Sequence, residues 1–340
     1  MKLKKITMKK YIYIIFTSFL LASCSSNSWN IDISNITINQ KFKRFDLDLF
    51  RINTDSIWSY VPSLEKKYGS FFDLYNQRII KIGGTNNFNY ADKLKNFITD
   101  PYINETFKIS EKIFQNNTFI TPINNAFKRY HYYFPERTIP NIYTHISGFN
   151  QSIVIDSTFI SVSLDKYLGK DSKFYKMLRT PIYLRNNMHP AKIPTDVIMA
   201  LGLTEFDYND STKNNLINQM IYYGKIHIFL DALLPNSTDT LKWGISKDKL
   251  KWCHKNERQI WMYLIENKLL FSSKYKEIKM FIDEGPFTKP FSKKSPARTG
   301  RWLGYQIVKS YMHNNKNISL TELMLNNNYQ EILDQAKYNP

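Results

Sequence analysis

The stretch Ile139 to Val162 reads IPNIYTHISGFNQSIVIDSTFISV and is the most strand-like part of the chain. Its apolar, β-branched and aromatic residues form three short runs, at 142–146, 153–155 and 159–162. Turn-forming residues separate the runs at 147–150 (Ser-Gly-Phe-Asn) and 156–158 (Asp-Ser-Thr). Apolar runs bounded in this way are typical of β-strands. The stretch therefore predicts two or three adjacent strands.

Outside this stretch the pattern is mainly helical. Asn35 to Lys43 alternates apolar and polar residues, which predicts an opening strand. Apolar residues at helical spacing predict helices at 54–81, 90–98, 104–115, 122–133, 172–178, 194–206, 213–234, 246–270, 274–283, 298–314, 319–326 and 328–337. Thr195 and Ser246 are predicted to precede helices, and Ser319 with Glu322 forms a capping-box pattern. We expect an α+β fold, a helix-rich single domain with a small β-sheet.

The N-terminus carries the pattern of an export signal. Five lysines precede an apolar run from Tyr11 to Ala22, which at about 12 residues is too short for the roughly 20 that span a bilayer. The run ends at Leu21-Ala22-Ser23-Cys24, which resembles the bacterial lipobox. There the cysteine thiol receives a diacylglycerol, the signal is cut before it, and the new amino group is acylated, typically with palmitate. Several acyl chains suffice for stable anchoring.

These signals divide the chain into three parts. Residues 1–23 are predicted to be a lipoprotein signal peptide, residues 24–34 a lipidated tether, and residues 35–340 the folded domain. The only other cysteine is Cys253, so the mature chain has no pair left for a disulfide. Its neighbour His254 points about 100° away on the predicted helix, and we expect Cys253 to be a buried structural residue.

The chain is strongly basic. Removing residues 1–23 takes away five lysines and no acidic residue, which lowers the formal charge from +18 to +13. Such a balance indicates polyanionic partners, among them anionic lipid headgroups and acidic cell-wall polymers. Export argues against nucleic acid. Because the lysines are spread along the chain, a solvated basic surface explains them equally well.

The sequence carries no assembled catalytic motif. Its six histidines are isolated, with no His-x-x-x-His pair, and neither Gly-x-Ser-x-Gly nor a phosphate-binding glycine loop occurs. We therefore predict no catalytic residue, no metal ligand and no cofactor. Two weaker alternatives remain open. Carboxylates from a set of six could pair in a hydrolase site: Asp46, Asp48, Asp156, Asp165, Asp231 and Glu266. Aromatic residues could line a glycan groove or belong to the core: Tyr130, Tyr132, Tyr133, Phe134, Trp252, Trp261 and Tyr263.

Six segments, taken in order with Cys24, resemble the gliding-motility lipoprotein GldB family of the Bacteroidota. They are Phe45–Phe50 (FDLDLF), Ile142–Asn150 (IYTHISGFN), Tyr222–Lys225 (YYGK), Asp231–Pro235 (DALLP), Gly285–Thr288 (GPFT) and Gly300–Val308 (GRWLGYQIV). The resemblance covers nearly the whole chain. It implies a membrane-anchored protein required for gliding over surfaces, with no reaction assigned to it.

The family is also similar, distantly, to zincin-like metallopeptidases, which pair a His-Glu-x-x-His helix with a later carboxylate before a glycine. The corresponding helix here, Ile193 to Phe206, contains no histidine. At the later position Tyr223 precedes Gly224 and Lys225. The resemblance therefore implies a degenerate zincin-like scaffold and a pseudoenzyme without the catalytic metal.

The leading hypothesis is a non-enzymatic lipoprotein that works with other proteins of the gliding machinery. Because Ser25 rather than an aspartate follows Cys24, we expect it to face the periplasm, whichever membrane holds it. One alternative is a zincin-like hydrolase whose metal is held by dispersed His and Asp residues, which stoichiometric zinc would support. The other is a binding module for acidic cell-wall or surface polymer.

The lipid anchor is tested by Cys24→Ser. Because the serine cannot accept the diacylglycerol, we expect the protein to be released or mislocalised in membrane fractionation. The same substitution at Cys253 leaves the lipobox unchanged and serves as the control. Normal fractionation of the Cys24→Ser variant would show that the domain has another anchor.

Overall fold

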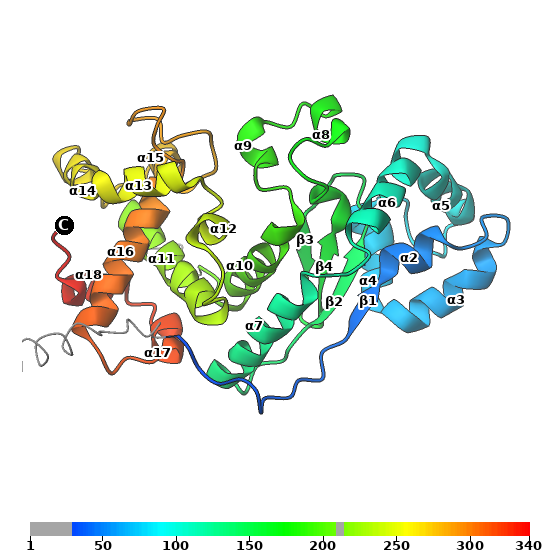
Figure 1. Ribbon diagram of the computed structural model, residues 1–340, viewed down its shortest axis with the longest axis horizontal. Helices are drawn as coiled ribbons and strands as arrows, with labels where there is room; N and C mark the ends of the chain where they lie inside the picture. The colour runs from blue at the N-terminus through cyan, green and yellow to red at the C-terminus, as the bar shows by residue number, and fades with distance from the viewer. Residues whose placement is uncertain (1–28, 209–213) are drawn as a thin grey trace, which may run out of the picture. The chain divides into compact units, whose positions relative to one another are not determined.

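A computed structural model describes residues 29–208 and 214–340. The predicted signal peptide and Cys24 lie outside the described residues. Residues Ile33–Pro340 form one compact unit. It is rich in helices and contains a small sheet (Figure 1), so the predicted α+β class is confirmed.

The sheet has four strands in the order β1-β2-β4-β3. They are β1 (Phe42–Arg44), β2 (Asn141–His145), β3 (Ile153–Ile155) and β4 (Phe159–Ser163). Strands β1, β2 and β4 are parallel, and β3 pairs antiparallel with β4 across the turn at 156–158. The stretch 139–162 therefore contributes three adjacent strands, as predicted. All of β4 is buried, as expected of a strand covered on both faces.

The predicted opening strand over 35–43 is mostly wrong. Only Phe42–Arg44 pairs with the sheet, and Phe45–Phe50 is helix α2. Pairing stops here because the next side chains point to other partners. The Phe45 ring contacts four aromatic rings, those of Tyr68, Phe71, Phe72 and Tyr75, at 4.7–6.1 Å between centroids. This buried aromatic cluster holds α2 against the helices that follow.

Helical elements occupy the chain between α2 and β2. They are α3 (Ile57–Tyr68), α4 (Ser70–Leu74), the π-helix η2 (Tyr75–Ile79), α5 (Tyr90–Thr99), α6 (Pro101–Ile113) and α7 (Ile120–Tyr133). The helical region predicted for 54–81 is interrupted at Gly69, whose φ of 53° favours glycine. Asp100 caps α6 by accepting hydrogen bonds from the Tyr102 and Ile103 amides, with Pro101 at the first helical position.

In the described part of the chain after the sheet, the regular elements are helices joined by loops. The elements are η3 (Leu164–Lys166), α8 (Lys173–Met177), α9 (Ile182–Arg185), η4 (Pro190–Lys192), α10 (Ile193–Glu205), α11 (Leu216–Leu233), α12 (Asp239–Trp243), α13 (Lys247–Lys255), α14 (Glu257–Glu266), α15 (Tyr275–Ile282), α16 (Thr299–Asn314), α17 (Leu320–Leu325) and α18 (Tyr329–Ala336). The short elements α9, α12, η3 and η4 were not predicted, because one or two turns carry no measurable periodicity.

The predicted helix ends have mixed outcomes. Ser246 caps α13, and Ser319 with Glu322 forms the expected capping box at α17. Thr195 is not a cap. Helix α10 already begins at Ile193, and the Thr195 hydroxyl donates 2.9 Å to the Lys192 carbonyl inside the first turn. The helix predicted for 246–270 divides into α13 and α14 at Asn256.

The most extensive helix pairing is between α11 and α16, which cross at two glycines. A β-carbon on Gly304 would overlap the Met220 carbonyl, and one on Gly224 would overlap the Gly304 carbonyl. Only residues without a side chain let the two backbones approach so closely. Most of α11 is buried as a result.

Gly304→Ala tests this crossing. The added methyl has no space between two helix backbones, so we expect the free energy of unfolding to fall by roughly 3 kcal/mol or more. Gly285→Ala is the matched control, since its new methyl would meet only atoms at 3.7 and 3.8 Å. Chemical denaturation of both variants measures the difference. Equal stability of the two variants would contradict the close crossing.

Candidate functional site

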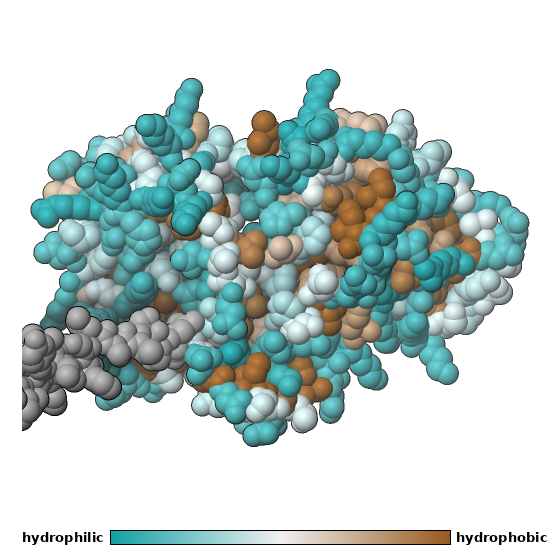
Figure 2. Space-filling view, viewed as in Figure 1, coloured by the Kyte–Doolittle hydropathy of each residue, from teal (hydrophilic) through white to brown (hydrophobic). Residues whose placement is uncertain are grey.

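Two adjoining cavities form a cleft beside α9, α10 and α12. Their volumes are about 380 and 310 Å³, and both are lined by Asn187, Gly244, Glu284 and Arg298. The Asn187 side-chain amide donates a hydrogen bond of 2.9 Å to the Gly244 carbonyl. This bond joins the chain after α9 to the chain after α12. In Figure 2 the surface is hollowed between these elements, whose positions are labelled in Figure 1.

Arg298 forms the border between the two cavities. Its guanidinium pairs with Glu284 at 2.9 Å and donates 2.8 Å to the Trp243 carbonyl. The residue has φ 59°, in the left-handed region that non-glycine residues rarely adopt, and it immediately precedes α16. Such strained positions persist only where their surroundings hold them, and they cluster at functional sites. The positive charge of Arg298 is therefore held at one place in the cleft.

The larger cavity has further cations. Lys170 is exposed at its edge, and the Lys249 ammonium donates 2.6 Å to the Pro286 carbonyl. Burial lowers the pKa of Lys249. Burial, followed by the charge of Lys192, also lowers the pKa of His189, which favours the neutral imidazole at pH 7.

The smaller cavity contains a paired carboxylate. Lys192 lies 2.8 Å from Asp196, one turn apart across the start of α10, and the Tyr167 hydroxyl donates 2.9 Å to the same carboxylate. Burial and then Asp196 raise the pKa of Tyr167 well above its usual range, so it stays a donor. Lys166 donates 3.1 Å to the Phe149 carbonyl at the far side.

The balance of charge in the cleft is positive. Its lining contains five cationic side chains and two carboxylates: Lys166, Lys170, Lys192, Lys249 and Arg298, with Asp196 and Glu284. Each carboxylate is paired with a cation. A concave surface lined with one sign of charge concentrates the field and attracts ligands of the opposite sign. The arrangement is suited to holding an anionic group.

The helix expected to correspond to a metal-binding helix borders this cleft. Helix α10 contributes Asp196 to it, and that carboxylate is engaged by Lys192 and Tyr167. Tyr223 occupies the position where the resemblance to zincins would place a later carboxylate. The Arg301 guanidinium lies over the Tyr223 ring, 3.8 Å from the ring centroid. Arg301 also donates 2.6 Å to the Ile282 carbonyl. These positions hold cations where zinc would require neutral imidazole and unpaired carboxylate.

The six carboxylates considered above are each bonded to their own partners or exposed. Asp48 binds Lys67 and Tyr68, and Asp231 binds Lys242 and Tyr305. Asp156 accepts from Ser157 in a turn, and Glu266 is exposed. Across residues 29–208 and 214–340, no group of three or more His, Cys, Asp or Glu side chains could hold a metal ion.

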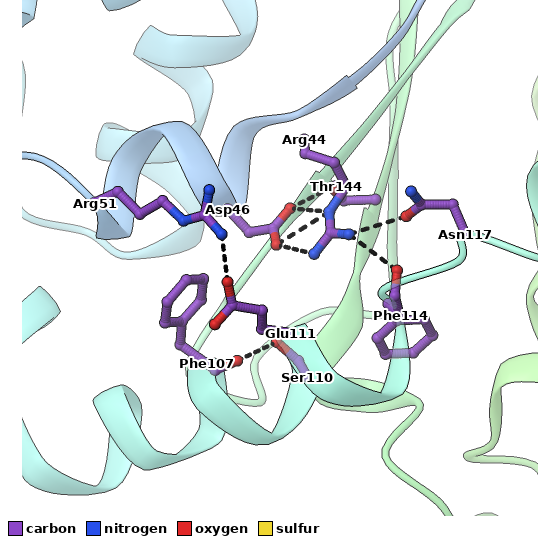
Figure 3. Close-up of polar contacts among 9 residues, drawn as sticks. All are labelled: Arg44, Asp46, Arg51, Phe107, Ser110, Glu111, Phe114, Asn117 and Thr144. Atoms are coloured by element: carbon purple, nitrogen blue, oxygen red, sulfur yellow. Dashed lines mark hydrogen bonds and ion pairs between the residues drawn. The ribbon is translucent and has the colours of Figure 1, made fainter.

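Asp46 joins three elements of the fold (Figure 3). Its carboxylate pairs with Arg44 at 2.6 Å and accepts a hydrogen bond from Thr144 on β2. Arg44 also donates to the Phe114 carbonyl and the Asn117 side chain, at 3.1 and 2.9 Å. The FDLDLF segment therefore contributes a structural ion pair at the edge of the sheet.

Asp165 organises the turn after β2. It is fully buried and accepts hydrogen bonds from the Ser147 and Phe149 amides, at 3.1 and 2.6 Å, and from the Ser163 hydroxyl. Burial raises the pKa of Asp165 while these hydrogen bonds oppose the shift. The carboxylate thereby fixes the Ser147–Asn150 turn, which supplies the carbonyl that Lys166 binds.

The aromatic candidates are divided between the core and the surface, with Tyr133, Trp252, Trp261 and Tyr263 partly buried. Tyr130 and Phe134 are buried, and Trp252, Trp261 and Tyr263 pack against other rings, whereas Tyr132 is exposed. Cys253 is a buried free thiol, as predicted, and burial raises its pKa to about 12. His227 stacks on Trp243 with 3.6 Å between ring centroids.

The cleft was not found from the sequence. Its cations come from separate elements between Lys166 and Arg298, and only their assembly in space makes them neighbours. Residues 172–195 contain five Lys or Arg and no Asp or Glu, but only Lys192 of these lines the cleft, so this local excess of positive charge would not have located it.

Comparison with known families shows to which family the chain belongs. The family model described as gliding motility protein GldB matches residues 26–340. The chain belongs to the GldB family. This membership assigns it a role in gliding motility, and the family's name marks its members as lipoproteins. No curated protein and no solved structure matches the chain. None of the helices in the described part of the chain is long and apolar enough to cross a bilayer.

The Tyr222–Lys225 segment places a buried cation in the fold of this GldB-family chain. Lys225 is 2% exposed, and its ammonium donates 2.6 Å to the Asn326 carbonyl and lies over the Tyr329 ring. Burial lowers the pKa of Lys225 to about 7. The proton is therefore held less tightly in the folded chain than in the unfolded one.

The lowered pKa of Lys225 predicts that the stability of the fold depends on pH. Between pH 7 and about 10 the unfolded chain binds more protons at this residue, so the free energy of unfolding rises with pH. We expect Lys225→Met to remove this contribution. The slope of the free energy of unfolding against pH should then fall by at most about 1.4 kcal/mol per pH unit. Denaturation across this range measures it, with Lys251→Met, at an exposed position, as the control. Parallel curves for wild type and Lys225→Met would contradict the prediction.

Proposed function

We propose that this GldB-family protein is a non-enzymatic, lipid-anchored component of the gliding machinery that faces the periplasm and binds an anionic ligand in its basic cleft. The observation that carries the proposal is the lining of the cleft, with five cationic side chains against two paired carboxylates. The ligand is an acidic cell-wall or surface polymer, and the lipid on Cys24 keeps the cleft in the envelope.

The fixed positions of the cations support binding. Arg298 is held by Glu284 and the Trp243 carbonyl, and Lys192 by Asp196 and Thr195. Charges already ordered before the ligand arrives lose little conformational entropy on binding. At the larger cavity the Lys249 ammonium is held by the Pro286 carbonyl, whereas Lys170 is exposed and has more freedom to meet the ligand.

The second candidate, a zincin-like metal-dependent hydrolase, has less support. Both cleft carboxylates are neutralised by cations, and a divalent ion would enter a site whose formal charge is already positive. The relationship to zincins remains a prediction from resemblance. The non-enzymatic reading is supported by the chemistry of these residues, because ligands for zinc must be unpaired and deprotonated.

The double variant Lys170→Glu/Lys249→Glu tests the cleft. Reversing two charges that line the larger cavity should weaken retention on acidic cell-wall polymer at low ionic strength at least tenfold. The same variant should fail to restore surface spreading to a strain that lacks the gene. Lys251→Glu/Lys276→Glu changes the net charge equally at exposed positions outside the cleft, and we expect it to behave as the wild type.

Two results would contradict the proposal. Equal loss of binding in both double variants would show that net charge, and not the cleft, attracts the polymer. Normal spreading in a clean deletion strain would show that the protein has no essential part in gliding.

A further inference from the structure

The segment that joins the sheet to α10 has an unusual distribution of charge. From Ser172 to Thr195 the chain has five Lys or Arg residues and no carboxylate. This segment contains the short helices α8 and α9, which project at the upper edge of Figure 1. We call the exposed part, residues 176–182, the α8–α9 tip.

The α8–α9 tip exposes three large apolar side chains within six residues. Met177 is 56% exposed, Leu178 55% and Ile182 67%. Figure 2 shows hydrophobic surface at the end of the α9 segment, beside the hydrophilic surface over α8. Single exposed apolar residues are common on proteins, but a cluster on a projection indicates a contact surface.

The tip is held outward by its buried base. Phe174 and Tyr175 are buried, and the Tyr175 hydroxyl donates 2.8 Å to the Asp165 carbonyl and accepts 2.9 Å from the Leu168 amide. Arg179 has φ 52°, which turns the chain between the two helices. The apolar side chains are therefore fixed on the outside and cannot be buried by a small rotation.

The cations of the tip are available to a partner. Lys176 and Arg179 are exposed, and neither pairs with a carboxylate of residues 29–208 or 214–340. Lys173, at the base, pairs with Glu105 at 2.5 Å. Basic side chains that flank protruding apolar ones match an anionic lipid surface, whose headgroups bind the cations while the apolar groups enter the interface.

The α14–α15 loop provides a contrast within the same chain. It also exposes aromatic residues, Phe271 at 59% and Tyr275 at 68%. Two of its lysines, however, are paired, Lys274 with Glu277 at 3.1 Å and Lys279 with Asp283 at 3.5 Å, whereas Lys268 and Lys276 are exposed. Exposed apolar surface whose positive charge is partly neutralised by nearby carboxylates has a weaker attraction to an anionic membrane.

We propose that the α8–α9 tip is a second membrane contact, in which Lys176 and Arg179 bind anionic phospholipid headgroups and Met177, Leu178 and Ile182 enter the interface. Protruding side chains favour a lipid surface over a protein groove as the occupant. The contact goes beyond the proposed function, and it takes from that function only the lipid anchor that brings the domain to the bilayer.

The test uses the full, lipidated chain reconstituted into vesicles with and without phosphatidylglycerol. An environment-sensitive fluorophore is attached at Leu178→Cys or, as the matched control, at Phe271→Cys. Labelling is selective because Cys253 is buried and the Cys24 sulfur carries the lipid. In anionic vesicles we expect the fluorescence of the probe at 178 to shift to the blue and to be quenched by lipid-attached quenchers, and both effects to disappear at high salt. We expect neither effect for the probe at 271, nor for either probe in vesicles without anionic lipid.

The cations are tested on the same probe. The double variant Lys176→Gln/Arg179→Asn removes both cations, and asparagine is chosen at 179 because it tolerates the left-handed backbone. Each cation contributes about fivefold to the equilibrium between membrane-bound and aqueous tip, so we expect a shift of about 25-fold toward the aqueous state. Vesicle flotation reports the lipid anchor separately. A chain that does not float contradicts the anchor. A chain that floats with an aqueous probe at 178, or with equal shifts at 178 and 271, overturns the proposed contact.

Discussion

The crossing of α11 and α16 at Gly224 and Gly304 is the constraint on which the C-terminal half depends. With no side chain between them, the two backbones meet directly, and the helices on either side pack against this pair. The crossing also determines where the cleft lies. Arg298 immediately precedes α16, and Tyr305 on α16 donates 2.6 Å to Asp231 on α11, which pairs with Lys242 of α12 at 2.7 Å. The crossing thereby helps to position Arg298, the cleft cation at the start of α16.

The opposite side of the cleft is held by buried polar groups near the sheet. Asp46 joins α2 to β2 and, through Arg44, to the end of α6. Asp165 fixes the turn after β2 and presents its own carbonyl to Tyr175, at the base of the α8–α9 tip. Buried carboxylates are costly unless their hydrogen bonds are satisfied, and both have several. Because its two sides are built on satisfied polar networks, the cleft has charges at defined positions.

The segments that resemble the GldB family are mainly structural in this chain. Gly224 and Gly304 form the helix crossing, Asp46 the ion pair at the sheet, and Asp231 the link to α12. The cations of the cleft and of the α8–α9 tip lie outside these segments. Family membership, over residues 26–340, therefore explains the fold and the role in gliding. The particular charges are the basis of the two proposed contacts, polymer in the cleft and lipid at the tip.

The sequence by itself determined the features that depend on neighbours along the chain. Periodicity predicted most helices and two or three strands in 139–162, and the capping box at Ser319 needs only residues up to Glu322. The resemblance to a lipobox at 21–24 likewise rests on consecutive residues. Tertiary structure alone decided the rest. The opening strand shortened to Phe42–Arg44 because pairing ended where Phe45 entered the aromatic core. The cleft exists because folding brings Lys166 near Arg298, residues of one sign that would repel each other unless Asp196 and Glu284 compensated them. Proximity between residues so distant in the chain depends on packing, and local periodicity contains no information about it.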